Sequence, residues 1–179
     1  MRLAFDTRRE DMKVCIIGTS GAGKTTLSAK LSDEFNTPVY GYDEIYWDKT
    51  QQEYIKNPQP IINALVSVIT SKTEWIVEGA YDRRLIPFFN DCTLIIRLII
   101  PYRICVFRIV KRYLSSKFTT MGPKETLFNM IELLRFAKQF DKRLDDFFAK
   151  NPLFASKVII IDNSEQCIDT IKKHLEQIK

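Results

Sequence analysis

Apolar and polar residues follow each other along this chain in blocks that distinguish strands from helices. Short segments rich in apolar residues predict strands at 14–17, 37–42, 75–78, 93–100 and 158–161. Between these segments, apolar residues recur every three or four positions, as on one face of a helix. Because strands and helices alternate, the pattern predicts an α/β protein whose parallel sheet is covered by helices on both faces.

The predicted helices begin where helix-opening residues stand. They cover 24–34, a stretch opened by Pro60, 101 to about 116, a longer stretch after Gly122 and Pro123 to about 150, and 165–178. A chain of 179 residues fits one domain, which we place at 12–179 with a lid near 114–124. Residues 1–11 precede the first predicted strand, and we expect them to form an N-terminal extension.

Charge changes this picture by concentrating on one part of the chain. The formal net charge is +5, and no acidic residue stands between Asp91 and Glu125. The basic residues of that interval are Arg97, Arg103, Arg108, Lys111, Arg112, Lys117 and Lys124. Such a local excess of positive charge favours an anionic ligand, although a solvated helix face would show the same pattern.

Composition also excludes several classes of site. No run approaches the roughly 20 apolar residues of a membrane span, and the N-terminus is too charged for a signal peptide, so we expect a cytoplasmic protein with no membrane partner. The four cysteines lack the paired spacing of a metal site and are expected to be reduced, mostly buried thiols: Cys15, Cys92, Cys105 and Cys167. His174 is the only histidine, which excludes a histidine-based zinc site.

The segment GTSGAGKTT contains a complete Walker A motif between a predicted strand and a predicted helix. Its glycines allow backbone N–H groups to point into one concavity, and the helix N-terminus adds partial positive charge. We expect ATP phosphates to be bound by Gly18, Thr19, Ser20, Gly21, Ala22, Gly23, Lys24, Thr25 and Thr26. In this motif the lysine reaches the β- and γ-phosphates, and the hydroxyl of Thr25 is a ligand of Mg²⁺.

Two acidic residues follow the second and third predicted strands at the same edge of the sheet. Asp43 is positioned to orient an acceptor hydroxyl or phosphate and to accept its proton, or alternatively to cap a helix that begins at Glu44. Glu78 stands where a Walker B acid holds Mg²⁺ through water, or is simply a surface acid at a strand end.

Arginines supply candidate contacts to the acceptor and to the transferred phosphoryl group. Tyr81, Arg83 and Arg84 follow Glu78, and a guanidinium there suits an anionic group of the acceptor, although a solvent-facing helix start is an equal alternative. Arg108 and Arg112 share one helix face, where they would neutralise charge on the phosphoryl group.

Aromatic residues surround Asp43 and allow two readings. They are Tyr40, Tyr42, Tyr46 and Trp47. Their rings would either stack on the base or sugar of an acceptor or pack in the core.

Four segments together resemble one family of adenylate-kinase-like proteins. They read IIGTSGAGKTTLSAKL, YGYDEIYW, WIVEGAYDRR and IPYRICVFRIVKRYL. Over roughly residues 12–145 the chain resembles the FlaR-type DNA topology modulation proteins. The resemblance implies a P-loop fold like that of nucleoside monophosphate kinases, with strand order 2-3-1-4-5. The chain departs from the family at Glu78, where aspartate is usual, and in the lid, where Lys117 is the only basic residue of 115–122.

These features support three functional hypotheses. The first is a kinase that uses ATP and Mg²⁺ to phosphorylate a nucleotide or another small molecule. The second is a nucleotide-binding regulatory protein with little turnover, which the sparsely basic lid favours. The third is a nucleic-acid-associated protein, which the pI near 9.0 allows but no recognition motif supports. We expect a monomer or a homodimer.

Overall fold

The computed structural model describes residues 12–48, 50, 55–118, 126–162 and 167–177. The expected N-terminal extension, residues 1–11, lies outside the described residues, and so does most of the expected lid, residues 119–124.

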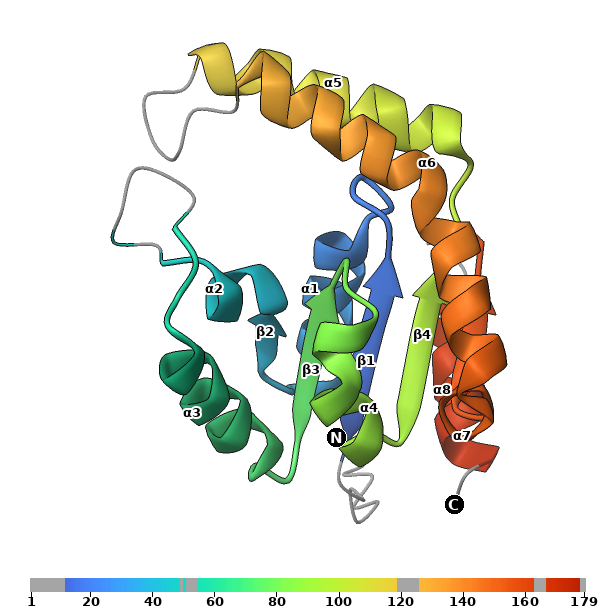
Figure 1. Cartoon of the computed structure of the whole chain (residues 1–179). Helices are drawn as coiled ribbons and strands as arrows, with labels where there is room; N and C mark the ends of the chain where they lie inside the picture. Colours follow the sequence, from blue (N-terminus) through green and yellow to red (C-terminus); the bar gives the residue numbers. More distant parts are fainter. Residues whose placement is uncertain (1–11, 49, 51–54, 119–125, 163–166, 178–179) are drawn as a thin grey trace, which may run out of the picture.

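A parallel sheet of five strands forms the centre of the molecule (Figure 1). Its strands are β1 (Lys13–Gly18), β2 (Val39–Gly41), β3 (Trp75–Gly79), β4 (Leu94–Leu98) and β5 (Val158–Ile161). All pairings are parallel and the order is β2-β3-β1-β4-β5, which confirms the predicted fold class and strand order. The carboxyl ends of the strands therefore meet at one edge, where ligands of such sheets bind.

Helices connect the strands and extend beyond that edge. They are α1 (Lys24–Phe35), α2 (Tyr42–Tyr46), α3 (Gln59–Thr70), the 3₁₀ turn η1 (Arg83–Leu85), α4 (Ile86–Asp91), α5 (Tyr102–Phe118), α6 (Leu127–Lys150), α7 (Pro152–Ala155) and α8 (Cys167–Gln177). In Figure 1, α5 and the first half of α6 run across the carboxyl ends of the strands.

The second strand is shorter than its sequence pattern predicts. A strand was expected over 37–42, but β2 has three residues and Tyr42 already belongs to the short helix α2. Glycine at 41 weakens the strand. Tyr42 and Ile45 are three residues apart, as on one face of a helix, and both are buried. The short helices α2, α4 and α7 have too few residues for a helical period to be recognised in the sequence.

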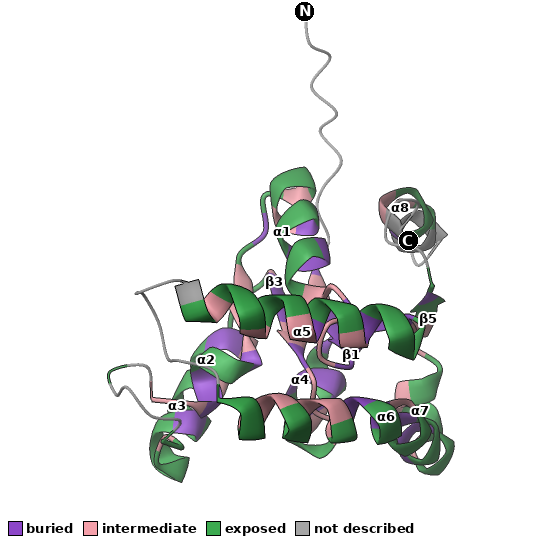
Figure 2. Ribbon diagram, turned by 90° about the horizontal axis from the view of Figure 1, so that it is seen from above, coloured by how far each residue is buried: buried purple, intermediate pink, exposed green. Residues whose placement is uncertain are grey.

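Alternate residues of the strands pack into two hydrophobic cores, one on each face of the sheet. Val14 and Ile16 of β1 pack in the core beneath α1 and α8, whereas Cys15 and Ile17 pack in the core beneath α3, α4 and α6. All four residues are fully buried. Viewed from above, the surfaces of α5 and α6 that face the viewer are largely exposed. The strands seen beneath these helices are largely buried (Figure 2).

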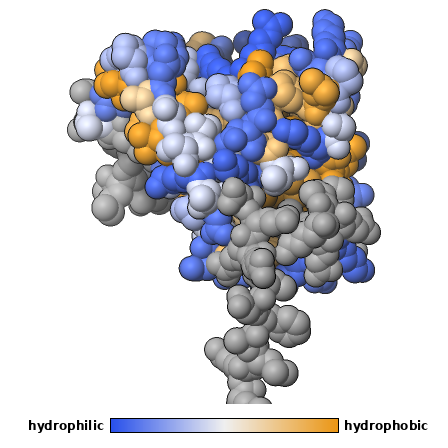
Figure 3. All heavy atoms as spheres, turned by 90° about the horizontal axis from the view of Figure 1, so that it is seen from below, coloured by the Kyte–Doolittle hydropathy of each residue, from blue (hydrophilic) through white to orange (hydrophobic). Residues whose placement is uncertain are grey.

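Seen from below, hydrophobic side chains form separate groups among hydrophilic ones (Figure 3). Within the described ranges, no helix is both long and apolar enough to cross a bilayer.

Arg97 interrupts the apolar β4, and the structure shows its partners. It is only 5% exposed, and its Nη1 donates to Asp145 Oδ1 at 2.6 Å while its Nη2 donates to the Asp141 carbonyl at 3.2 Å. Both partners belong to α6. Arg97 is therefore a tie between the sheet and α6 and not part of an open cationic surface.

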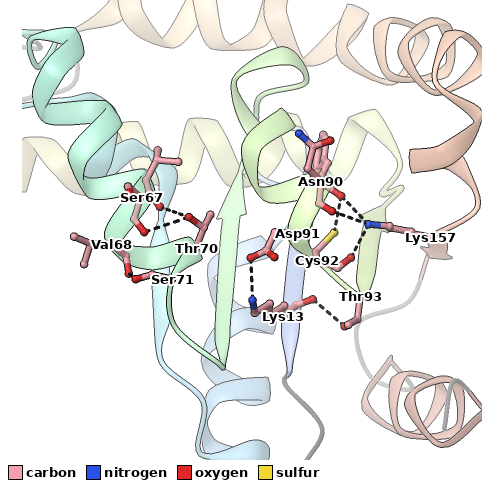
Figure 4. A network of polar contacts seen from close by, with 12 residues as sticks. Lys13, Ser67, Val68, Thr70, Ser71, Asn90, Asp91, Cys92, Thr93 and Lys157 are labelled. Atoms are coloured by element: carbon pink, nitrogen blue, oxygen red, sulfur yellow. Dashed lines mark hydrogen bonds and ion pairs between the residues drawn. The ribbon is translucent and has the colours of Figure 1, made fainter.

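At the opposite edge of the sheet, Lys157 closes the C-terminal end of α4 (Figure 4). Its Nζ donates to the carbonyls of Phe89 at 2.9 Å, Asn90 at 3.3 Å and Cys92 at 2.8 Å. A cation at a helix C-terminus satisfies carbonyl groups that have no partner within the helix and interacts favourably with the helix dipole. This contact fixes α4 against the loop that leads into β5.

We predict that Lys157→Met lowers the free energy of unfolding by about 1–2 kcal/mol, because helix-terminal carbonyls lose their donor. Urea denaturation measures this change. Lys172→Met is the matched control, since Lys172 forms a surface ion pair with Glu34 that should contribute less than about 1 kcal/mol. Equal effects of the two substitutions would contradict the capping role.

Candidate nucleotide and acceptor site

The Walker A loop joins β1, which ends at Gly18, to α1, which begins at Lys24. Two of its glycines have backbone conformations that side chains disfavour, with φ of 78° at Gly21 and 98° at Gly23. A Cβ atom on Gly21 would also lie 2.8 Å from the carbonyl oxygen of Cys105 in α5. Glycine is therefore required there both by the turn and by the close approach of α5.

The loop carries polar groups that suit a phosphate. The N-terminus of α1 has no side-chain cap and no acidic residue in its first turn, and the buried hydroxyl of Thr19 has no hydrogen-bond partner among the described residues. Lys24 donates from Nζ to the Thr19 carbonyl at 3.0 Å. Burial lowers the pKa of Lys24, and the carboxylates of Glu78 and Asp43 oppose this shift. An anion in this loop would receive unpaired N–H groups and the Lys24 ammonium group.

The two residues that the sequence predicts to bind Mg²⁺ meet beside the loop. The Thr25 hydroxyl donates to Glu78 Oε1 at 2.9 Å, which brings the two predicted metal residues together. Among the described residues, no group of three or more His, Cys, Asp or Glu side chains forms a protein-only metal site. Two oxygens beside a phosphate-binding loop suit Mg²⁺, which commonly completes its octahedron with phosphate and water oxygens. Of the other Walker A residues, Thr26 is exposed and Ala22 is buried.

The first half of α5 contacts the loop through Arg108. Its Nη1 donates to the carbonyl of Gly21 at 3.0 Å and to that of Ala22 at 3.3 Å. Arg112, one turn further along α5, lies close enough to Lys24 to contribute to the lowering of the Lys24 pKa. Of the two arginines that were predicted to share a helix face, Arg108 therefore contacts the Walker A loop, and the charge of Arg112 acts on Lys24.

Asp43 lies in the first turn of α2 and belongs to a chain of hydrogen bonds. Tyr81 donates from its hydroxyl to Asp43 Oδ1 at 2.7 Å. The Trp47 side chain in turn hydrogen-bonds the Tyr81 hydroxyl. Gly41 is the N-cap of α2, and the cap makes no side-chain hydrogen bond. Asp43 therefore does not cap a helix at Glu44, which was the alternative to a functional role.

The structure distinguishes the two adjacent arginines of η1. Arg84 lies over the rings of Tyr46 and Tyr81, with its Cζ 4.0 and 5.0 Å from their centroids. Arg83 is exposed, and its side chain makes no contact of this kind within the described part of the chain. The stacked guanidinium keeps its in-plane N–H groups available for an anion. Arg84 is thus held against Tyr81, the hydrogen-bond partner of Asp43, and no such ring contact holds Arg83 in the described part of the chain.

The aromatic residues around Asp43 pack mainly on one another. Tyr42 is 4% exposed, and its ring lies 5.1 Å from that of Tyr81 and 6.4 Å from that of Tyr46. Trp47 meets Tyr46 edge to face at 4.7 Å. Most of this ring surface therefore belongs to the core, and the half-buried Tyr81 presents its hydroxyl to Asp43.

Sequence reasoning named Asp43 and Tyr81 separately but missed their hydrogen bond. The signal that would have suggested it is the strand order, because β2 and β3 are neighbours and Gly41 is paired with Glu78. Residues just beyond these two strand ends must lie close together. The contact of α5 with Gly21 left no signal in the sequence beyond the glycine itself.

Comparison with known proteins agrees with this geometry at the level of the fold. No protein-family model matches the chain, and no curated protein matches it. A shikimate kinase from Bacteroides thetaiotaomicron superposes with a TM-score of 0.53 at 16% identity, covering 93% of this chain and 98% of that one. A deoxyadenosine kinase from M. mycoides gives 0.54 at 18% identity, with 94% and 100% covered. A shikimate kinase from Acinetobacter baumannii, in complex with shikimate, gives 0.54 at 15% identity, with 95% and 96% covered.

The chain thus has the P-loop fold of small-molecule kinases of the nucleoside monophosphate kinase type. At these identities the similarity shows the fold alone. The resemblance to FlaR-type proteins is not confirmed by these comparisons.

We predict that Arg108→Ala weakens ATP binding about 10- to 100-fold, because the loop loses a charged donor to two of its carbonyls. Titration with a fluorescent ATP analogue measures the affinity. Arg103→Ala is the matched control, because Arg103 is an exposed arginine on the same helix and is expected to leave the affinity within twofold. Equal losses in both variants would show that only the overall charge of α5 matters.

Proposed function

We propose that this protein is an ATP-dependent phosphotransferase that phosphorylates a small-molecule or nucleotide acceptor. One observation carries the proposal. Thr25 of the Walker A loop contacts Glu78 at 2.9 Å, Glu78 is paired with Gly41 two residues before Asp43, and both acids act on the charge of Lys24. A phosphate-binding loop, a candidate metal-binding acid and a candidate base therefore lie at one edge of the sheet. Nucleotide binding alone needs the first two but not Asp43.

The donor half of the proposed site would work by positioning and by charge. The loop N–H groups and Lys24 would hold the ATP phosphates, while Arg108 braces the loop and Arg112 adds positive charge near Lys24. Mg²⁺, held by Thr25 and Glu78, would neutralise phosphate charge. Such electrostatic stabilisation is the main requirement of phosphoryl transfer, which needs little covalent help from the protein.

The acceptor half would be built from the ends of β2 and β3. Asp43 would contact the reacting oxygen of the acceptor, with Tyr81 beside it. Arg84, stacked on Tyr46 and Tyr81, would bind an anionic group of the acceptor. Arg83 was an equal candidate from sequence, and the stacking favours Arg84 over it.

The distribution of cations argues against a nucleic-acid surface. Arg97 is bound to Asp145, Arg108 to the nucleotide loop, and Arg143 to Asp82 at 3.1 Å. These arginines serve contacts within the molecule, whereas a nucleic-acid interface needs cations arranged along an open face. A regulatory protein that binds ATP without transfer remains the second candidate, because Lys117 is the only basic residue in the sequence 115–122.

The proposed activity predicts acceptor-dependent release of ADP from Mg-ATP. A coupled assay would test nucleosides, nucleoside monophosphates, hydroxy acids, sugars and vitamins as acceptors. One acceptor is expected to raise the rate, and Lys24→Ala to lower that rate at least about 100-fold by removing the phosphate-binding cation. Lys30→Ala, an exposed lysine of the same helix, is the control. ATP binding with no gain from any acceptor would favour the regulatory protein.

For an acceptor identified in this way, we predict that Arg84→Ala raises its KM about tenfold, because a charged hydrogen-bond donor to the acceptor is lost. Arg83→Ala is the matched control and should leave KM within twofold. Steady-state kinetics at saturating ATP separates KM from kcat. A larger effect at Arg83 than at Arg84 would reverse the assignment.

A further inference from the structure

The hydrogen bonds at Asp43 have a defined direction. The indole of Trp47 can only donate, so the Tyr81 oxygen accepts from it and directs its own proton to Asp43 Oδ1. Burial and the neighbouring Asp43 carboxylate raise the pKa of Tyr81 well above its ordinary value, so the phenol keeps that proton. Asp43 is therefore the accepting end of the chain.

One oxygen of this carboxylate is left for a ligand. Asp43 is exposed, and its Oδ2 has no hydrogen-bond partner among the described residues. Its charge acts on Lys24, so the carboxylate lies on the side of the nucleotide loop. Glu78, the other acid that acts on Lys24, contacts the Thr25 hydroxyl and belongs with it to the proposed Mg²⁺ site. Asp43 is thus the acid available to an acceptor.

A carboxylate at this point favours a hydroxyl acceptor and disfavours a phosphate acceptor. A hydroxyl group can donate its hydrogen bond to Oδ2 and give up its proton there. A phosphate acceptor is already anionic, needs no base, and is repelled by a carboxylate a few ångströms away. The arrangement of Trp47, Tyr81 and Asp43 therefore suits the first class and penalises the second.

We propose that the acceptor oxygen of this site is a hydroxyl rather than a nucleotide phosphate, and that Tyr81 is a positioning residue that presents Asp43 to it. This inference rests on the proposed function. In the reaction, the hydroxyl proton passes to Asp43 Oδ2 as the oxygen forms a bond to the γ-phosphorus of ATP. The bond from that phosphorus to the bridging oxygen breaks, and ADP leaves with the electron pair. The products are a phosphate monoester and ADP.

Water allows a test that does not depend on knowing the acceptor, since it is the smallest hydroxyl acceptor. Asp43→Asn is expected to lower acceptor-free ADP release from Mg-ATP at least about tenfold, with ATP affinity unchanged. Glu44→Gln removes the carboxylate that follows Asp43 in α2 and has no proposed role in the reaction, so it should keep the wild-type rate. An unchanged or raised rate in Asp43→Asn would overturn the proposal.

Nucleosides and their monophosphates provide a second test. Phosphorus NMR of the products should show only monoesters, and new β-phosphate signals from AMP, CMP, GMP or UMP would overturn the proposal. AMP binding, measured with ADP and Mg²⁺ saturating, is expected to tighten at least about threefold in Asp43→Asn, because a repulsive charge is removed. Unchanged or weaker AMP binding would count against a hydroxyl site.

The role of Tyr81 is tested by a double-mutant cycle. Tyr81→Phe should lower kcat roughly tenfold without changing the KM for ATP, and Tyr42→Phe, which removes a hydroxyl from the same aromatic cluster, should not. If Tyr81 acts through Asp43, the double variant Asp43→Asn/Tyr81→Phe is no slower than Asp43→Asn alone. Additive losses would show that Tyr81 only supports the local fold.

Failure of the proposed function has a different signature. If ADP release by the wild type does not exceed that of Lys24→Ala, either without an acceptor or with any acceptor tested, no phosphoryl transfer occurs. The proposed function and this inference then both fall. If release depends on Lys24 but not on Asp43, the phosphotransferase stands and only the hydroxyl acceptor is wrong.

Discussion

The close approach of α5 to the Walker A loop at Gly21 is the constraint on which the site depends. A side chain at this position would collide with the backbone of Cys105, so only glycine allows the helix to rest on the loop. That contact brings Arg108 to the loop carbonyls. The same glycine gives the loop the left-handed turn that a phosphate-binding concavity requires. Glycine at position 21 thus determines both the shape of the loop and the position of Arg108 beside it.

Helix α6, which follows α5, is likewise held in place by arginines. Arg97 ties its middle to β4, and Arg143 ties it to Asp82 just before η1. Arg143 also lies over the rings of Phe136 and Phe140, which makes this contact partly a packing contact. Of the basic residues between Asp91 and Glu125, Arg97 thus holds α6 across the strand ends, whereas Arg108 contacts the Walker A loop.

The fold could be predicted from the sequence because its signals are local. Apolar strands alternating with helices define a parallel sheet, and the Walker A motif identifies β1 and α1, while the strand order followed from the family resemblance. The acceptor side could be predicted only as a set of residues. The bond between Asp43 and Tyr81 joins positions 38 residues apart in the chain, and the choice between Arg84 and Arg83 depends on which side chain reaches the rings of Tyr46 and Tyr81. Such choices are made by packing, which leaves no periodic pattern in the sequence.

We expect the Walker A loop, which lies beside the pair of Thr25 and Glu78, to bind ATP together with Mg²⁺. Isothermal titration of the full chain with ATP, with and without Mg²⁺, tests it most directly, with Glu78→Gln as the variant that removes the charge of the metal-binding acid. We expect Mg²⁺ to tighten ATP binding in the wild type, and Glu78→Gln to lose most of this gain while still binding ATP without metal. Absence of ATP binding, or a Mg²⁺ effect that is the same in both proteins, would contradict the account.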